Sequence, residues 1–308
     1  MPLGKKLLGV ELSSGLILKA ESPRGWFEEQ GQMQMRVLLG CLLFVCSIVP
    51  MQSIAKSIPT TAPSLQFPQG KVAFSLITLT PESVGRRKTL VTEVVKDKIY
   101  TLDQVQGIIN VNVPVRSTII ALRDGLFINN PVAPTDECVE IVKNIENKLK
   151  KKVKYIVLSS VALEHKGTSI FFSKKFPDAE VYVQPEQFSF PINLPTNFYF
   201  PFGKNIKIIP ASHLMAPWGD EIEHEILTVK PSSIGTYAET AFFHKSTQSL
   251  LVTDIIVKVG DAPDTIIDDD PRALLYHARD NILEEIDDTP SNRLKGWRRM
   301  VRINIILE

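Results

Sequence analysis

The residues best suited to chemistry in this sequence are Glu164 and His165, which follow the largely apolar run Val153 to Leu158 after a short interval. An imidazole nitrogen and a carboxylate oxygen are ligands that zinc accepts, and a carboxylate can also act as a general base. An apolar run of this length is typical of a strand buried on both faces. Sites in such sheets gather at the carboxyl ends of the strands, so we expect His165 as a metal ligand and Glu164 as a general base or a ligand. A histidine hydrogen-bonded within its loop and a surface glutamate are the alternatives.

The other candidate residues are weaker. His277 follows Leu274-Leu-Tyr on an expected helix, where it is either a packing residue or a ligand that replaces a lost one. The run Asp268 to Asp270 stands directly before Pro271, which is typical of a helix start with Asp270 as N-cap rather than of a metal site. Three more histidines are scattered, and we expect each to be a surface or hydrogen-bonded residue: His213, His224 and His244.

Composition excludes several kinds of site. The 308 residues carry a formal net charge of +1, with 44% hydrophobic and 22% charged residues, which is ordinary for a globular protein. So small a charge gives no field that would attract nucleic acid, and we expect none as a partner. Of the three cysteines, only Cys138 lies outside an apolar N-terminal run. The body of the chain can therefore form neither an internal disulfide nor a cysteine-based metal site.

The segment before Lys96 is expected to lie outside the fold. Residues 1–34 carry no clear pattern and form an unassigned extension. Residues 35–55 contain a basic residue, a short apolar run and then small residues, as in a signal peptide, with a buried helix as the alternative. Residues 56–95 begin with proline and hydroxyl-bearing residues, as in a transit segment or a linker. This order predicts delivery to a plastid, with secretion as the alternative, and no stable transmembrane span in the mature chain.

From Lys96 onward the sequence predicts alternating strands and helices. Arg123-Asp124-Gly125 is a turn signal between two short apolar runs, 117–122 and 126–129, which predicts a hairpin. Thr135 is a good N-cap, and the apolar stripe that ends at Leu149 predicts an amphipathic helix after it. Residues 159–167 are expected to form a loop. The remaining expected strands are 153–158, 181–183, 206–209, 221–229, 240–243 and 250–257. This order argues for mixed sheets covered by helices.

The residues after the buried strand resemble a known superfamily. In metallo-β-lactamase-like hydrolases the corresponding loop reads Thr-His-x-His-x-Asp-His-x-Gly, whereas this chain reads Ser159-Ser-Val-Ala-Leu-Glu-His-Lys-Gly167. On this resemblance, Ser160 and Ala162 occupy the positions of the first two ligand histidines. Glu164 replaces the aspartate, and His165 keeps the last histidine.

A second phrase, Ser249-Leu-Leu-Val-Thr-Asp254, resembles the later strand whose aspartate bridges two metals. The resemblance therefore makes Asp254 a ligand; its alternative role is to bond loop amides after a strand. The Pro-Gly-His ligand that lies between the two phrases in the superfamily has no clear counterpart. Relatives also supply a histidine from a C-terminal strand end, and this chain stops at Glu308 before such a segment. We therefore expect a domain that is incomplete at its C-terminus.

The body also resembles one uncharacterised branch, a domain of unknown function found widely in photosynthetic organisms. The phrases that carry this resemblance are Gly107 to Arg116, Asn130 to Thr135, Leu163 to Lys166 and Asp269 to Arg279. It implies a fold and a plastid setting, and it implies no activity.

Together these features predict a metallo-β-lactamase-like αββα sandwich over residues 96–308 with a degenerate metal site. Because Ser160 and Ala162 supply no imidazole, the remaining groups suit one zinc or iron ion or none, but not the usual pair of ions. We expect a non-catalytic role in binding a small molecule or a protein, or in assembly. The alternative is a hydrolase of a small ester, lactone or thioester, in which His165 and Asp254 bind one ion and Glu164 orients water.

Overall fold

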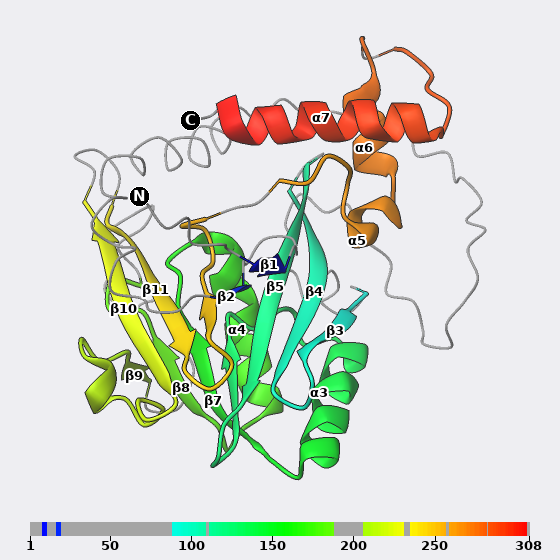
Figure 1. The fold of residues 1–308 in the computed structure, drawn as a ribbon. Helices are drawn as coiled ribbons and strands as arrows, with labels where there is room; N and C mark the ends of the chain where they lie inside the picture. Colours follow the sequence, from blue (N-terminus) through cyan, green and yellow to red (C-terminus); the bar gives the residue numbers. More distant parts are fainter. Residues whose placement is uncertain are drawn as a thin grey trace, which may run out of the picture.

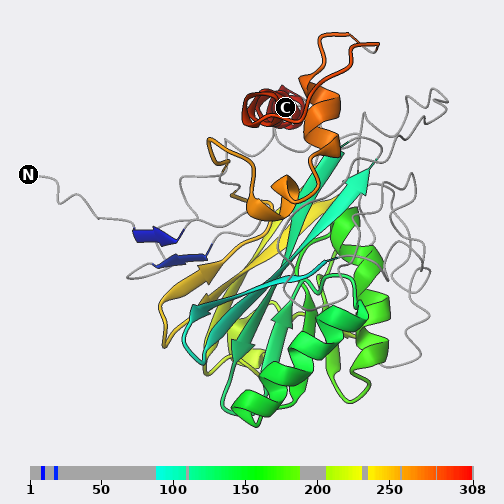
Figure 2. The same ribbon diagram turned by 90° about the vertical axis from the view of Figure 1, so that its right-hand side faces the viewer.

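Two β-sheets packed face to face form the body of the protein (Figures 1 and 2). The computed structural model describes residues 8–10, 17–19, 88–108, 111–187, 206–230, 235–256, 259–281 and 283–306. Most of the expected signal and transit segments, 35–55 and 56–95, lie outside these ranges. The described part has the mixed α/β architecture that the sequence predicts, which confirms the expected fold class.

The larger sheet contains β7, the strand that directly precedes the candidate site. Its order is β3-β4-β5-β6-β7-β8-β9. These strands are β3 (Leu90–Val95), β4 (Ile99–Ile108), β5 (Val111–Ala121), β6 (Leu126–Asn129), β7 (Val153–Leu158), β8 (Glu180–Val183) and β9 (Lys207–Ile208). Neighbours from β3 to β6 are antiparallel, and neighbours from β6 to β9 are parallel. The carboxyl ends of the parallel strands therefore meet at one edge of the sheet, where loops can build a site.

Most of the expected strands of this sheet are present. The hairpin around Arg123-Asp124-Gly125 joins β5 to β6, and the expected buried strand is β7. Strands β3 and β4 were not predicted. In β4 the apolar alternation is interrupted by Asp103, which is buried because Arg116 of β5 binds it through two hydrogen bonds of 2.6 and 2.9 Å.

The smaller sheet is antiparallel throughout, in the order β1-β2-β12-β11-β10. Its strands are β1 (Leu8–Val10), β2 (Ile17–Lys19), β10 (Ile222–Val229), β11 (Tyr237–His244) and β12 (Ser249–Leu251). Strands β1 and β2 come from the extension 1–34, where no strand was expected. The prediction of a strand over 250–257 was wrong in its length: β12 ends at Leu251, and the chain bends at 253–256.

Aromatic side chains fill the space between the two sheets. Phe127 of β6 lies edge-to-face against Trp218, with ring centroids 5.1 Å apart, and against Phe242 of β11 at 5.2 Å. Tyr155 of β7 also lies edge-to-face against Trp218, with ring centroids 5.5 Å apart. Edge-to-face contacts of this kind add to the stabilisation that comes from apolar burial. This core fixes the spacing of the two sheets whose ends carry the site.

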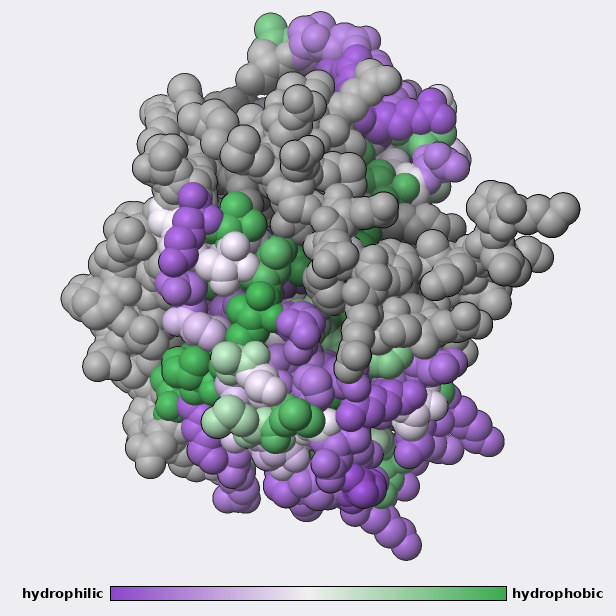
Figure 3. All heavy atoms as spheres, turned by 60° about the vertical axis from the view of Figure 1, so that its left-hand side comes forward, coloured by the Kyte–Doolittle hydropathy of each residue, from purple (hydrophilic) through white to green (hydrophobic). Residues whose placement is uncertain are grey.

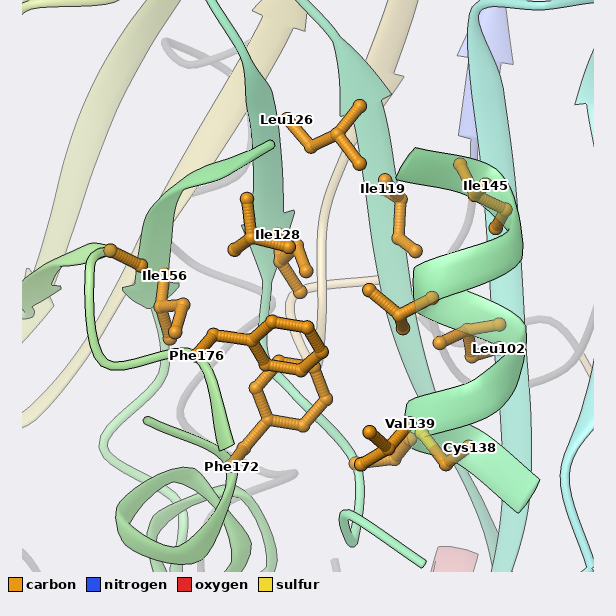
Figure 4. Packing of buried hydrophobic residues seen from close by; sticks show 14 of the residues in the cluster. Leu102, Ile119, Leu126, Ile128, Cys138, Val139, Ile145, Ile156, Phe172 and Phe176 are labelled. Carbon is orange, nitrogen blue, oxygen red and sulfur yellow. The ribbon is translucent and has the colours of Figure 1, made fainter. Parts of the chain in front are cut away.

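Two helices cover the outer face of the larger sheet, α3 (Asp136–Leu149) and α4 (Leu163–Lys175) (Figure 2). As predicted, Thr135 caps α3: its Oγ1 accepts a hydrogen bond from the N–H of Cys138 at 3.0 Å. Figure 4 shows Phe172 and Phe176 from the α4 region facing Ile128 and Ile156 of the sheet. The apolar stripe of α3 completes the same core.

The expectation of a loop over 159–167 was wrong, because α4 begins at Leu163. Ala162 is the N-cap residue and offers no side-chain cap, while Glu164 lies in the first turn, where the helix dipole favours a carboxylate. The helical period is hidden in the sequence by Gly167 and by the consecutive apolar residues Ile170 to Phe172. Both candidate residues of this segment are therefore held on a helix rather than on a loop.

Three further helices gather beyond one end of β4 and β5 (Figure 1). They are α5 (Thr265–Asp268), α6 (Arg272–Ala278) and α7 (Pro290–Ile306), and they share a small core that includes Leu274 and Trp297. The start of α6 was predicted one residue early: Pro271 is the N-cap, although Asp270 still accepts the N–H of Arg272 at 3.3 Å.

None of the helices in the described ranges is long and apolar enough to cross a membrane. The face in Figure 3 shows small hydrophobic patches between hydrophilic ones.

Candidate metal centre

Two chain segments meet where β7 and β12 end. The first runs from Ser159 through the start of α4, which places Glu164 and His165 on the first turn of that helix. The second is the bend at 253–256, which carries Asp254. The Nε2 atom of His165 lies 3.8 Å from Oδ2 of Asp254, and one ligand atom from each of Glu164, His165 and Asp254 lies within 4.8 Å of the others. The structure therefore brings together the three candidate residues that the sequence singled out in these segments.

Main-chain pairing between the two sheets fixes this meeting point. Ser160 forms an isolated antiparallel bridge with Glu239 of β11. On either side of it, the N–H of Val161 donates to Ala238 at 3.1 Å, and the N–H of Thr240 donates to Ser159 at 2.8 Å. The chain that leaves β7 thus joins the smaller sheet before it turns into α4. This pairing is what brings the end of β7 beside the bend that carries Asp254.

Two residues of β11 that the sequence analysis did not identify complete the site. The side chain of Glu239 is completely buried and accepts the N–H groups of Asp254 at 2.8 Å and Ile255 at 3.1 Å. The hydroxyl of Tyr237 donates to Glu239 at 3.0 Å and lies 3.4 Å from Oδ2 of Asp254. The signal in the sequence was a single carboxylate, Glu239, in the segment that forms β11.

The charged groups shift one another's proton equilibria. Burial, and then the charge of Asp254, raises the pKa of Glu164. Burial alone would lower the pKa of His165, but the Asp254 carboxylate beside it outweighs burial and raises the pKa overall. Burial also opposes the charge on Asp254, yet His165 and two neighbouring hydroxyl groups lower its pKa. Without a metal, this arrangement favours a positive imidazolium beside a negative carboxylate.

The centre is sheltered but reachable. The side chain of His165 is 6% exposed, whereas that of Asp254 is 29% exposed. A small ion or water molecule can therefore approach from the side of Asp254. Glu164 is also partly exposed, whereas His165 is buried. Reduced contact with water strengthens electrostatic interactions at such a position.

The donor atoms of Glu164, His165 and Asp254 could together hold one metal ion. One imidazole and two carboxylates are suitable ligands for zinc or for iron, and they leave further positions for water. At the two positions where the resembling hydrolases carry histidines, Ser160 Oγ donates to Asp254 at 3.1 Å and Ala162 has no donor atom. Val161 is buried against Tyr237 and Ala238. Ser160, Val161 and Ala162 therefore add no imidazole to the group.

The other candidate histidines lie outside this group. His277 is on α6, where its ring packs against that of Tyr276 at 5.3 Å. The hydrogen-bonded role expected for His224 is confirmed, because its Nε2 lies 2.7 Å from the carbonyl of Pro210. The same holds for His244, whose Nδ1 lies 2.7 Å from Thr247 Oγ1. His213 lies in a 3-10 turn, with its ring 6.3 Å from that of His224.

Comparison with known proteins gives a family and several structural neighbours. The family model described as "Domain of unknown function (DUF4336)" matches residues 96–308. No curated protein matches the sequence. The chain is similar to the mono-zinc form of the metallo-β-lactamase FIM-1 from Pseudomonas aeruginosa, at 12% identity and a TM-score of 0.33 over 50% of this chain and 63% of that one. It is also similar to a putative diflavin flavoprotein fragment from Nostoc, at 16% identity and a TM-score of 0.38 over 62% and 79% of the two chains. The chain thus spans less than two thirds of the FIM-1 structure.

Proposed function

Since this chain belongs to the DUF4336 family, whose function is unknown, we propose a function from the site itself: the domain binds a single divalent metal ion, zinc or iron, and is a degenerate member of the metallo-β-lactamase-like fold. The observation that carries this proposal is the 3.8 Å approach of His165 Nε2 to Asp254 Oδ2, with Glu164 in the same group. A small molecule or a partner protein would then be recognised through the open positions of the ion. In this reading the domain serves binding or assembly rather than dinuclear hydrolysis.

The chemistry of the ligands supports one ion. A divalent ion between His165 and Asp254 would take the place of the proton on the His165 imidazolium and would offset the negative charge of two carboxylates, which repel each other when both are ionised. A second ion would need imidazoles that Ser160 and Ala162 do not have. The ion would supply Lewis acidity or a binding position for an anionic group, and Glu164, His165 and Asp254 would hold and orient it.

Elemental analysis tests this proposal directly. The folded protein should carry one equivalent of zinc or iron, and the metal-free protein should take up one equivalent of zinc by calorimetry. His165→Ala and Asp254→Asn should each abolish stoichiometric binding. His277→Ala is the matched control, because it removes a histidine that lies outside the group, and it should bind as the native chain does. A native chain that takes up no metal would refute the proposal.

A metal-dependent hydrolase of a small ester, lactone or thioester is the second candidate. The observation that favours it is Lys166, which follows His165 and whose pKa burial lowers to about 8, against the charge of Glu164. Groups with shifted pKa values near neutrality are characteristic of catalytic sites. In this reading Glu164 would orient the attacking water. Turnover of small aryl esters, lactones or thioesters by the metal-loaded protein, lost in His165→Ala, would support this candidate over the first.

Delivery to a plastid through a signal and a transit segment remains the proposed location, with secretion as the alternative. It rests on residues 35–55 and 56–95. A fusion of residues 1–95 to a fluorescent protein would test it, with residues 35–55 deleted in the control. Fluorescence outside plastids from the undeleted fusion would refute plastid delivery.

A further inference from the structure

The carboxylate of Glu239 binds three consecutive backbone N–H groups, those of residues 253, 254 and 255. Its Oε1 accepts from Thr253, and its Oε2 accepts from Asp254 at 2.8 Å and from Ile255 at 3.1 Å. Glu239 is completely buried, so no water competes for these donors. A buried carboxylate is costly unless hydrogen bonds compensate it. Here three of the compensating donors come from the bend that carries Asp254, and the Tyr237 hydroxyl is a further donor.

Glu239 also contacts the segment that runs from Ser159 into α4. The main chain of Glu239 pairs with Ser160, and the hydroxyl of Ser160 bonds Asp254. Glu239 thus contacts both segments of the site, one through its backbone and the other through its side chain.

Asn130 provides a second link between these segments. Its Nδ2 donates to Thr253 Oγ1 at 2.7 Å, and its Oδ1 accepts the N–H of Ser159 at 2.9 Å. The residue has a φ of 46°, a conformation that asparagine tolerates better than most residues. The side chain of Asn130, directly after β6, therefore joins the end of that strand to both segments of the site.

We propose that Glu239 is a positioning residue, which holds Asp254 opposite His165 by fixing the bend at 253–255. This inference rests on the proposed metal site and adds a residue that binds the main chain of Asp254 and is not itself one of the proposed ligands. Partners of this kind, which orient the ligands, change metal affinity by about 10- to 100-fold when they are removed. Glu239→Gln is the informative variant, because an amide has one acceptor oxygen and its NH₂ group would face an N–H of the bend.

The test compares Glu239→Gln with Glu146→Gln. Glu146 is also a buried carboxylate that accepts a backbone N–H, from Val153 at 2.8 Å, but it joins the end of α3 to the start of β7 rather than to the site. Cobalt(II) affinity and the visible spectrum of the cobalt-loaded chain are measured below the unfolding temperature of each variant. Glu239→Gln should bind cobalt about tenfold more weakly or worse, with an altered spectrum. Glu146→Gln should lose stability but keep both properties.

Equal cobalt affinity and an unchanged spectrum in Glu239→Gln would overturn the positioning role. Should that variant not fold, Glu239→Asp keeps both acceptor oxygens on a shorter arm and should show a smaller change in the same direction; no change would overturn the inference. The imidazole proton resonances of His165 in metal-free protein give a readout without metal. They should shift in Glu239→Gln and not in Glu146→Gln, and unshifted resonances would count against the role. If the native chain binds no cobalt but the His165 resonances still shift in metal-free Glu239→Gln, the proposed function would be refuted and the positioning role would remain supported.

Discussion

The hydroxyl of Ser160 donates a hydrogen bond of 3.1 Å to Oδ2 of Asp254, from a position 94 residues earlier in the chain. By the resemblance to metallo-β-lactamase-like hydrolases, this hydroxyl stands where a ligand histidine would be. This hydrogen bond stabilises the ionised form of Asp254 and contributes to the lowering of its pKa.

Ser160→Ala should lower stability and leave the metal stoichiometry at one. A hydrogen bond to a charged group contributes about 1.5–3 kcal/mol, and the partial exposure of Asp254 allows water to replace part of it. We expect a loss of about 1 kcal/mol in the free energy of unfolding, measured on metal-free protein with urea. Loss of zinc binding in this variant would contradict the prediction, because it would make the hydroxyl itself a ligand.

The pH dependence of stability should contain a contribution from Glu93. Its carboxylate accepts the N–H of Asp97 at 2.6 Å, together with Lys148 Nζ at 3.0 Å and the Tyr100 hydroxyl at 2.9 Å. These donors lower the pKa of Glu93 from 4.5 to about 2. Because the folded pKa lies below the unfolded one, the stabilisation is complete above pH 4.5 and is lost as the pH falls from 4.5 to about 2.

The measurement is the difference in unfolding free energy between the native chain and Glu93→Gln at a series of pH values. This difference should favour the native chain at neutral pH and shrink across the acid window. Since the group is accessible to solvent, the effect should be small and should weaken with salt. A difference that stays constant down to pH 2 would argue against the assignment.

Local signals explain which parts of the fold could be predicted. The hairpin over Arg123-Asp124-Gly125 and the capped helix after Thr135 depend on turn and cap chemistry within a few residues, and both are present. The resemblance of two separate phrases predicted that Asp254 and His165 lie close together. In the structure, Asp254 Oδ2 and His165 Nε2 are 3.8 Å apart. In contrast, the length of β12 was wrong because Glu239 takes the N–H groups that would have continued the strand.

The roles of Tyr237 and Glu239 could not be predicted for a related reason. Both residues precede the strand expected at 240–243. Their place in the site depends on the isolated bridge between Glu239 of β11 and Ser160, which follows β7. Pairing of this kind is set by the packing of the whole domain rather than by a local pattern. A site that two sheets build together is therefore only partly visible in the sequence.

The N-cap of α3 gives a third prediction. Thr135 Oγ1 accepts the N–H of Cys138 at 3.0 Å, and Thr135 is 3% exposed, so water cannot replace this bond. Thr135→Ala should reduce the free energy of unfolding by about 1–2 kcal/mol. Thr135→Ser keeps the hydroxyl and is the matched control, which should lose less. Equal losses in the two variants would show that the threonine methyl group, not the cap, is responsible.

Contact between α6 and α7 depends on the absence of a side chain at Gly296. A Cβ atom there would lie 1.8 Å from the carbonyl oxygen of Leu274, which is backbone and cannot rotate away. Alanine is favoured over glycine within a helix by about 1 kcal/mol, but so close an approach forces the two helices apart. Gly296→Ala should therefore destabilise the protein by about 1–3 kcal/mol despite its better helix propensity. Hydrogen exchange should quicken in α6 and α7 more than in β6 or β7.

The control is Arg298→Ala, at an exposed position of the same helix, which should change stability by no more than about 0.5 kcal/mol. A stabilised Gly296→Ala variant would show that α7 does not pack closely on α6 in solution.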